Sequence, residues 1–403
     1  MTGKLIYDES MAKVMYGFIY ALRPDGQLLR TGDDWSETRL PYVVEYKITS
    51  FYAANLFGGE SKRLLDDYRE INWCNNTLTP AQYLIFNDAK LGTKPLSGLP
   101  LTYHMGSPLG ETITRTGWDI DHSDDVLVMM KSGEHTGMNH DHLDSGNFQI
   151  YYRGIIASES GVYDLYFTPR TRTATRRPRR TTACLYTTRT RTLRVARTAA
   201  DSGMSARTTR QGCFKESGVC KTFQLHTQEK PEINGKTTIL KNTKGKNHSA
   251  LVCRTLLPAN TEISKTGGAG HEFDIGSVSY TSRVMPGDSN VAEAGWGRVE
   301  VKPGKPSCTD TFLNGMYVTD AGNTSETHNA ELIGGEGVVG ARVLDEAVVF
   351  TESRDMTLLE FVIPGGGEVN VVLTGAGAGK WSVGGGTITV SEEGATLSFR
   401  HDS

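Results

Sequence analysis

The sequence has 403 residues, 37% of them hydrophobic and 22% charged, with a formal net charge of −3. This length is enough for two or three domains with buried cores, and the composition excludes a chain that is disordered throughout. No window reaches the roughly 20 apolar residues of a membrane span, and the first residues lack a basic stretch followed by an apolar run, so we expect no signal peptide, no membrane partner and, for the chain as written, a cytoplasmic protein.

The first predicted element is a buried helix over Met11 to Leu22, where apolar residues recur at three- and four-residue spacings. Arg23-Pro24-Asp25-Gly26 follows as a turn that ends it. Further helices are predicted over 48–68 and 80–87, so helices are expected to dominate as far as about Leu96.

After Leu99 the pattern changes to short stretches of alternating residues separated by Gly, Asn, Asp and Pro, which predicts antiparallel strands packed as a sandwich. The predicted strands include LTYHM, ETITRTGW, VLVMMKSG, NFQIYYRG, KTFQLHT, TTILKNT, ALVCRTLLP, GWGRVEVKPG and FLNGMYVTDA. From about Asn323 the strands become shorter and richer in glycine, which indicates a small terminal β-domain. We expect Trp118 and Trp296 in the sandwich core.

Six cysteines show no C-x-x-C pair, so we expect isolated thiols that are reduced or buried: Cys74, Cys184, Cys213, Cys220, Cys253 and Cys308. Most histidines also show no paired carboxylate pattern and are expected on the surface, in loops or at strand ends: His104, His122, His226, His248, His271 and His328.

A histidine cluster stands out in GMNHDHLDSGNFQIYYRG, residues 137–154. If the segment is extended, His140 and His142 share one face, because side chains repeat with a period of two. Two such imidazoles can bind a metal together, or one can bind while its neighbour transfers protons. A short H-x-H also occurs by chance in surface loops, so composition alone leaves both interpretations open.

The stretch around this cluster, GWDIDHSDDVLVMMKSGEHTGMNHDHLDSGNFQIYYRGIIASESGVYD, closely resembles the segment typical of the heparinase II/III family of polysaccharide lyases. Four other segments agree with the family: Tyr20–Asp34, Met105–Trp118, Leu256–Phe273 and Phe312–Asp320. The heparinase II branch is the most similar. The resemblance implies a mainly β protein, with the end of an α/α toroid at 1–96, a central antiparallel β-sandwich at 97–322 and a small C-terminal β-domain at 323–403.

The resemblance also implies β-elimination on a uronate-containing acidic polysaccharide. His140 then corresponds to the catalytic histidine and His142 to the first ligand of a structural zinc. Glu159 stands where the family usually has an Asp ligand, which keeps the carboxylate but lengthens its side chain. His135, Asn139 and Asp144 are candidates for the substrate cleft. The family's catalytic tyrosine lies upstream of this chain, and Tyr16 and Tyr20 match a core-facing helical stripe rather than a replacement for it.

An Arg/Thr tract at about 168–212 interrupts the sandwich. From Thr168 to Arg210 it holds 12 Arg, no Lys and one acidic residue, a net +11 that leaves −14 for the rest of the chain. A nucleic-acid-binding arm is one interpretation, but such arms usually mix Lys with Arg, lie at termini and carry aromatic residues for stacking. The tract has few large apolar residues and dense like charge, so we do not expect it to form a buried strand.

The genetic code supports another interpretation of the Arg/Thr tract. Thr codons begin with AC, so a one-nucleotide shift converts each Thr into a codon that ends in AC, for Tyr, His, Asn or Asp. From Arg180 onward the shifted frame permits His-Asn-Cys-Leu-Leu-Val-Tyr-Asp-Pro, which is the family's strand with its remaining zinc-binding histidine. We therefore interpret the tract as out-of-frame translation that ends by about Lys221. Sequencing the codons at Thr181 and Thr182 tests this.

The sequence thus predicts a lyase fragment that is impaired as this chain, with an incomplete zinc site. A non-catalytic carbohydrate-binding β-protein is the alternative. The expected partner is an acidic polysaccharide and not nucleic acid, and a homodimer is left open. The resemblance implies a cell-envelope or periplasmic protein.

Overall fold

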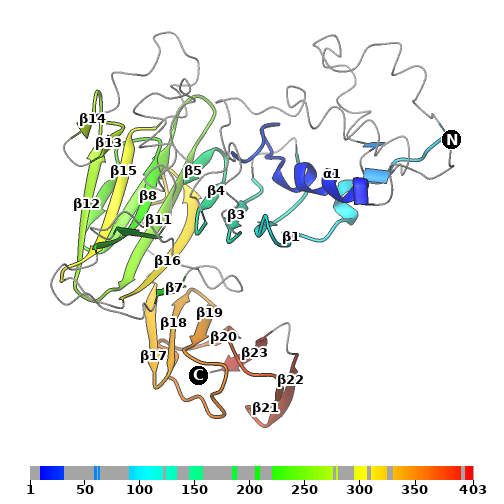
Figure 1. Ribbon diagram of the computed structural model, residues 1–403, viewed down its shortest axis with the longest axis vertical. Coiled ribbons are helices and arrows are strands. Elements are labelled where there is room, and N and C mark those ends of the chain that lie inside the picture. The colour runs from blue at the N-terminus through cyan, green and yellow to red at the C-terminus, as the bar shows by residue number, and fades with distance from the viewer. Residues whose placement is uncertain are drawn as a thin grey trace.

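The computed structural model describes residues 10–30, 59–60, 62–63, 90–120, 124–133, 145–157, 184–187, 205–208, 220–275, 278–279, 295–305, 310–324, 330–391 and 395–402. These residues are mainly β and form several antiparallel sheets (Figure 1). No described helix is both long and apolar enough to span a membrane.

Helix α1 (Ser10–Ala21) confirms the predicted first helix. Met15, Ile19 and Leu22 are fully buried, and their spacing places them on one helical face. The predicted turn follows, with the Gly26 amide donating to the Arg23 carbonyl at 3.0 Å. Other described helical residues are 59–60, 62–63 and the 3₁₀ turn η2 (Leu96–Gly98), so no toroid remnant is shown. The predicted helix at 80–87 and most of that at 48–68 lie outside the described residues.

The first sheet contains five antiparallel strands in chain order, as the alternation predicted. They are β1 (Thr102–Met105), β2 (Glu111–Arg115), β3 (Leu127–Lys131), β4 (Phe148–Tyr151) and β5 (Ile155–Ala157). Ile113, Leu127 and Met129 pack in one cluster with Tyr20 of helix α1. This sheet and α1 are therefore joined by a shared core.

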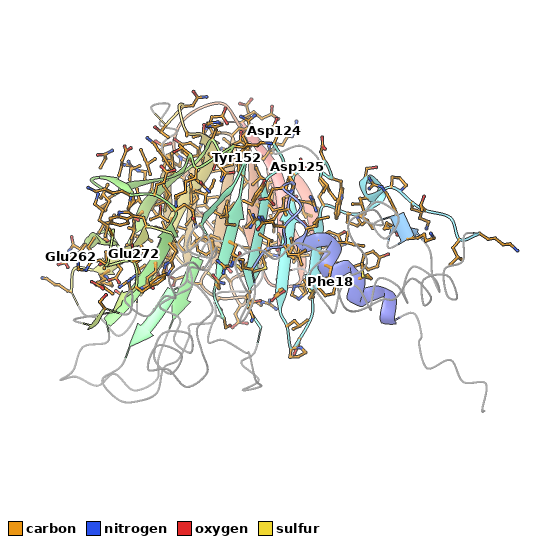
Figure 2. The ribbon with its side chains drawn as sticks, turned by 90° about the horizontal axis from the view of Figure 1, so that it is seen from above. Phe18, Asp124, Asp125, Tyr152, Glu262 and Glu272 are labelled. Atoms are coloured by element: carbon orange, nitrogen blue, oxygen red, sulfur yellow. The ribbon has the colours of Figure 1, made fainter. Side chains whose placement is uncertain are left out.

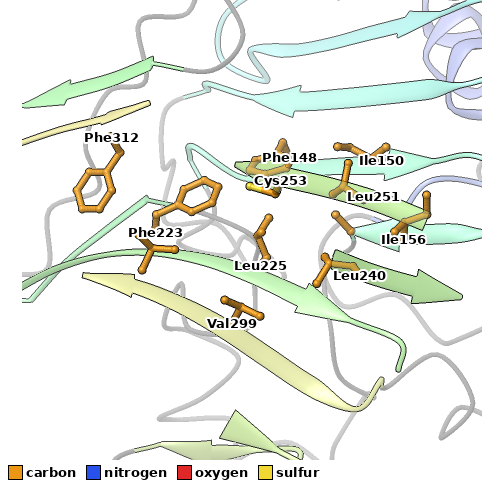
Figure 3. Packing of buried hydrophobic residues seen from close by; sticks show 12 residues of the cluster. Phe148, Ile150, Ile156, Phe223, Leu225, Leu240, Leu251, Cys253, Val299 and Phe312 are labelled. Atoms are coloured by element: carbon orange, nitrogen blue, oxygen red, sulfur yellow. The ribbon is translucent and has the colours of Figure 1, made fainter. Parts of the chain in front are cut away.

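Two further sheets share the largest core with strands β4 and β5 (Figure 3). One has the order β12-β15-β8-β6, and the other has the order β7-β16-β11-β10-β9. Their strands are β6 (Cys184–Thr187), β7 (Ser205–Thr208), β8 (Cys220–Thr227), β9 (Glu232–Asn234), β10 (Thr237–Asn242), β11 (Ser249–Leu257), β12 (Thr261–Gly267), β15 (Gly297–Pro303) and β16 (Asp310–Asp320). A small hairpin pairs β13 (Asp274–Ile275) with β14 (Val278–Ser279).

Alternation explains this core. Phe223 and Leu225 of β8 and Val299 and Val301 of β15 point inward at two-residue intervals. Leu251 of β11 meets them in the same cluster. Cys253, also on β11, is a buried free thiol whose pKa is raised by burial to about 12, which confirms the prediction for this cysteine.

The described residues of the Arg/Thr tract, 184–187 and 205–208, form two four-residue strands, which its composition did not predict. Strand β6 pairs with β8, and β7 pairs with β16, so each lies at the edge of its sheet. Main-chain hydrogen bonding permits this, because it requires no apolar side chain from the added strand. Strand β6 also falls in the segment where the shifted reading frame predicts a family strand.

The last sheet has the order β17-β18-β19-β20-β23 and its own hydrophobic core. Its strands are β17 (Glu331–Gly335), β18 (Val338–Val343), β19 (Glu346–Thr351), β20 (Glu368–Thr374) and β23 (Thr396–Asp402), and a hairpin is formed by β21 (Gly379–Val383) and β22 (Gly386–Val390). Strands β19 and β20 are parallel, whereas the other pairs of this sheet are antiparallel. A parallel pair requires a long crossover connection, and residues 352–367 provide it.

Candidate functional site

The residues that the sequence proposes for catalysis, zinc binding and the substrate cleft lie outside the described residues: His135, Asn139, His140, His142, Asp144 and Glu159. The structure describes the strands that flank them. The histidine motif belongs to the connection between β3 and β4, and Glu159 follows the end of β5 by two residues.

Both flanking segments belong to one sheet. The Lys131 amide donates to the Asn147 carbonyl at 2.9 Å, and the Gly146 amide donates to the Lys131 carbonyl at 2.7 Å, so the connection begins and ends on a closed pair of strands. Strand β5 is antiparallel to β4, with Ala157 opposite Ile150. The chain before β4 and the chain after β5 therefore leave the sheet at the same end.

A close backbone contact fixes the start of this connection. The Ser132 amide donates to the Gly110 carbonyl at 2.8 Å. A Cβ atom on Gly133 would lie 1.9 Å from the Leu109 carbonyl oxygen, and one on Gly110 would lie 2.4 Å from the Gly133 nitrogen. No side chain fits at either position without a backbone shift, so the two glycines let the β1–β2 turn support the connection that carries the histidine motif.

Gln149 anchors the segment after helix α1 to strand β4. Its side chain is fully buried, accepts from the Arg30 amide at 3.2 Å and donates to the Arg30 carbonyl at 2.5 Å.

Nearby, the buried Arg23 pairs with Asp25 at 2.5 Å and lies 5.2 Å from the Tyr151 ring centroid. Burial raises the pKa of Tyr151, so its hydroxyl stays protonated at neutral pH.

Arg115 is the most unusual charge in this region, because its side chain is almost wholly buried. Burial lowers its pKa to about 10, and its guanidinium lies 4.0 Å from the Trp118 ring centroid. Nε donates to the Gly117 carbonyl at 2.5 Å, whereas Nη2 has no hydrogen-bond partner among the described residues. Trp118 is half-buried and packs against the α1 clusters, so the expectation that it lies in the sandwich core was wrong.

Tyr16 and Tyr20 do not have the environment of a catalytic base. Tyr20 is buried, donates its hydroxyl to the Pro100 carbonyl at 2.7 Å and stacks on Tyr103 at 4.8 Å. Burial raises the pKa of both Tyr16 and Tyr20, and Glu60 raises that of Tyr16 further. A raised pKa keeps the phenol protonated, which supports the core-facing interpretation of this helix.

The isolated histidines differ in their surroundings. His104 is exposed and shares a 2.8 Å hydrogen bond with Thr112, and His248 is also exposed. His226 is buried in β8. His271 corrects the sequence prediction, because its Nδ1 lies 2.7 Å from the Asp274 carboxylate. His271 and Asp274 are brought together by a turn in which the His271 amide donates to the Gly268 carbonyl. No apolar periodicity in the sequence indicates this turn.

A partly buried ionic cluster on β8 and β15 was not predicted. Arg298 Nε and Lys302 Nζ lie 2.7 and 2.6 Å from the two carboxylate oxygens of Glu300, and Gln224 donates to the same carboxylate at 3.3 Å. Burial alone would raise the pKa of Glu300, but the hydrogen bonds and charges of Lys302 and Arg298 outweigh it and lower that pKa below its ordinary value. Trp296, two residues before Arg298, is half-buried and lies against Gly267 and Gly268.

A second ionic group joins the first sheet to β16. Arg153 contacts Asp124 at 2.6 Å and Asp320 at 3.1 Å, and the Tyr152 hydroxyl donates to Asp320 at 2.9 Å. Figure 2 shows Tyr152 and Asp124 near one another, at the opposite end of the strands from Phe18 of helix α1. Within the described ranges, no group of three or more His, Cys, Asp or Glu residues has the arrangement of a metal site.

No protein-family model matches the sequence. No curated protein matches it either. Among solved structures, "Crystal Structure of Heparinase III" aligns over 85% of this chain and 54% of its own, with a TM-score of 0.50 and 12% identity. Heparan sulfate lyase HepC from Pedobacter heparinus aligns over 86% of this chain and 52% of its own, with a TM-score of 0.48 and 14% identity. The chain thus spans about half the length of these structures, and at such identities the similarity is one of fold.

Proposed function

We propose that the chain derives from a uronate-specific polysaccharide lyase of the heparinase II/III type, nearest to the heparinase II branch. The observation that carries the proposal is the histidine motif of residues 137–144, which lies between two paired strands of a fold similar to Heparinase III. Fold similarity alone does not assign an activity, so the motif supplies the chemical argument.

The proposed reaction is a β-elimination. A base removes the proton from C5 of the uronate, the C4–O bond to the leaving sugar breaks while an acid protonates its oxygen, and a double bond forms between C4 and C5. His140 is the residue proposed to transfer a proton, and His135, Asn139 and Asp144 are proposed to line the substrate cleft. Arg115 and Gln149 act indirectly, because they hold the sheet and the 22–30 segment in place.

The proposed zinc site is incomplete. His142 and Glu159 are ligand types that zinc accepts. The start of β4, which follows His142 in the chain, and the end of β5, which precedes Glu159, lie at the same end of the sheet. A structural zinc takes about four protein ligands, and the Arg/Thr tract contains no histidine to supply another. These residues do not complete a zinc site, and no step of the proposed reaction depends on the metal.

We further propose that residues 1–96 derive from the end of an α/α toroid, that 97–322 and 323–403 are the sandwich and C-terminal domains, and that the parental enzyme acts in the cell envelope or periplasm. Because positioning supplies much of an enzyme's rate enhancement, the lack of a zinc-binding histidine in the Arg/Thr tract predicts an impaired chain. The alternative is a non-catalytic protein that binds carbohydrate without turnover.

The test measures the ultraviolet absorbance of unsaturated uronate products from heparin, heparan sulfate, chondroitin and alginate. We expect little product from the chain as it stands and clear product from a version with the reading frame restored. In that version His140→Ala should lower the rate by about 10² to 10⁴-fold, as expected for loss of a general acid or base. His104→Ala, at an exposed histidine of the same sheet, is the matched control and should leave the rate unchanged.

If the restored version yields no product from any uronate polymer, the lyase proposal is wrong. Full activity of the His140→Ala variant would reject the assignment of that residue alone.

A further inference from the structure

The C-terminal sheet contains an open cleft of about 750 Å³ that no part of the proposed reaction uses. Its walls are the crossover connection 352–367 and strand β21, and its floor is the face of β20 and β23. Figure 1 shows strands β20–β23 at the bottom of the view, well below β3 and β4, which flank the histidine motif. The volume is in the range of small-ligand sites.

The crossover wall is fastened at several points. The Arg342 guanidinium donates to the Pro364 carbonyl and, at 3.0 Å, to the Gly366 carbonyl. Phe361 forms a β-bridge with Gly335, and a Cβ on Gly377 would lie 2.4 Å from the Arg354 carbonyl oxygen. The wall is thus held against both β17 and the loop before β21, so the cleft is preformed.

The floor is apolar and partly uncovered. Leu397, Phe399 and His401 share one face of β23 because they alternate along the strand, and all three line the cleft. Phe361 and Trp381 line it as well and are half-buried. The Trp381 Nε1 donates to the Gly377 carbonyl at 2.9 Å, which fixes the orientation of the indole.

The rim carries charges of both signs. Lys380 and His401 are exposed, and within the described part of the chain no hydrogen bond or ion pair joins either side chain to another residue. Arg354 adds a third basic group. Of the two acidic residues, Asp355 accepts a hydrogen bond from Ser353 at 3.4 Å, and Glu360 completes the rim.

We propose that this cleft binds a short stretch of acidic polysaccharide at a site separate from the proposed catalytic residues; the choice of a saccharide rests on the proposed function. An aromatic and apolar floor suits the C–H faces of sugar rings. Carboxylates on the rim accept from sugar hydroxyls, whereas lysine and arginine bind carboxylate or sulfate groups. A neutral sugar has no anionic group to pair with Lys380 and Arg354. An acidic peptide has few hydroxyl groups to donate hydrogen bonds to Asp355 and Glu360.

The test measures the binding of a heparin hexasaccharide to the full chain by calorimetry. Lys380→Glu and Trp381→Ala should each weaken the Kd by about tenfold, which corresponds to one charge-assisted hydrogen bond or one ring contact. Arg400→Glu is the matched control for Lys380→Glu, because it makes the same charge change on β23 at a residue that pairs with Glu368 at 3.1 Å outside the cleft. Trp381→Phe is the control for Trp381→Ala, because it retains an aromatic ring. Arg400→Glu and Trp381→Phe should each alter the Kd by less than about threefold.

Three results would overturn the proposal: absence of hexasaccharide binding by the folded chain, unchanged binding in both Lys380→Glu and Trp381→Ala, or equal affinity for poly-glutamate. Thermal unfolding of each variant confirms that it is folded. The lyase assay is read separately, so product without binding at the cleft rejects this inference alone. Binding at the cleft without product from the restored version rejects the lyase proposal alone.

Discussion

At the scale of single residues, Glu300 shows how a partly buried charge is accommodated. Its carboxylate is paired on both oxygens, by Arg298 and Lys302 of its own strand and by Gln224 of β8. Alternation along β15 predicts that these residues share the face opposite Val299 and Val301. It does not predict the contact with Gln224, because that depends on the pairing of strands 76 residues apart.

Glu300→Gln should lower the free energy of unfolding by about 1 to 3 kcal/mol at neutral pH, because it removes a partly buried charge that is hydrogen-bonded on both oxygens. The folded pKa of Glu300 is lowered, so its stabilisation is present above the unfolded pKa, near 4.5, and is lost as the pH falls through the folded pKa. Urea unfolding of both proteins between pH 7 and pH 3 should show the difference shrinking below about pH 4.5.

The matched control is Glu368→Gln, since Glu368 forms an exposed pair with Arg400 at 3.1 Å. An exposed pair contributes about 0 to 1 kcal/mol, so this variant should stay close to the wild type. A stability difference for Glu300→Gln that persists unchanged to pH 3 would contradict the argument.

At the scale of elements, Gln149 substitutes for a neighbouring strand. Its amide forms with the Arg30 backbone the pair of hydrogen bonds that a strand residue would supply. Gln149→Ala should lower the free energy of unfolding by about 2 to 4 kcal/mol, since it leaves a buried N–H and C=O unpaired. Chemical denaturation measures this change.

Asn370→Ala provides the comparison, because the Asn370 amide donates to Glu346 at 2.9 Å on the exposed surface. Its effect should remain within about 0.5 kcal/mol, as is usual for surface substitutions. Equal effects of the two substitutions would show that Gln149 does not anchor the 22–30 segment.

Elements that depend on local pattern were predictable from the sequence, whereas their pairing was often not. Helix α1 follows from the spacing of Met15, Ile19 and Leu22, and strands β1 to β5 follow from alternation. The parallel pairing of β19 with β20 has no local signal, because it depends on the path of a 16-residue connection. The contact between His271 and Asp274 depends on one turn, and only the spacing of three residues between them indicates it in the sequence. The site residues of the histidine motif remain predictions.

At the scale of the whole molecule, the chain spans about half the length of the lyase structures that it resembles. The Arg/Thr tract contains no histidine that could act as a further ligand at the proposed zinc site. Metal analysis of the purified chain should find less than about one-tenth zinc per molecule, because two donors fall short of a structural site. A version with the reading frame restored should bind about one. Stoichiometric zinc in the chain as it stands would contradict the proposal.

The two short strands of the Arg/Thr tract have a consequence for how such a chain remains folded. Strands β6 and β7 occupy the outer edges of β8 and β16, where unpaired amides and carbonyls would otherwise be open to other chains. Edge pairing requires an extended backbone and makes little demand on side-chain identity. If the tract is translated out of frame, an unselected stretch of sequence can still protect a sheet from aggregation, so solubility can outlast the loss of a functional strand.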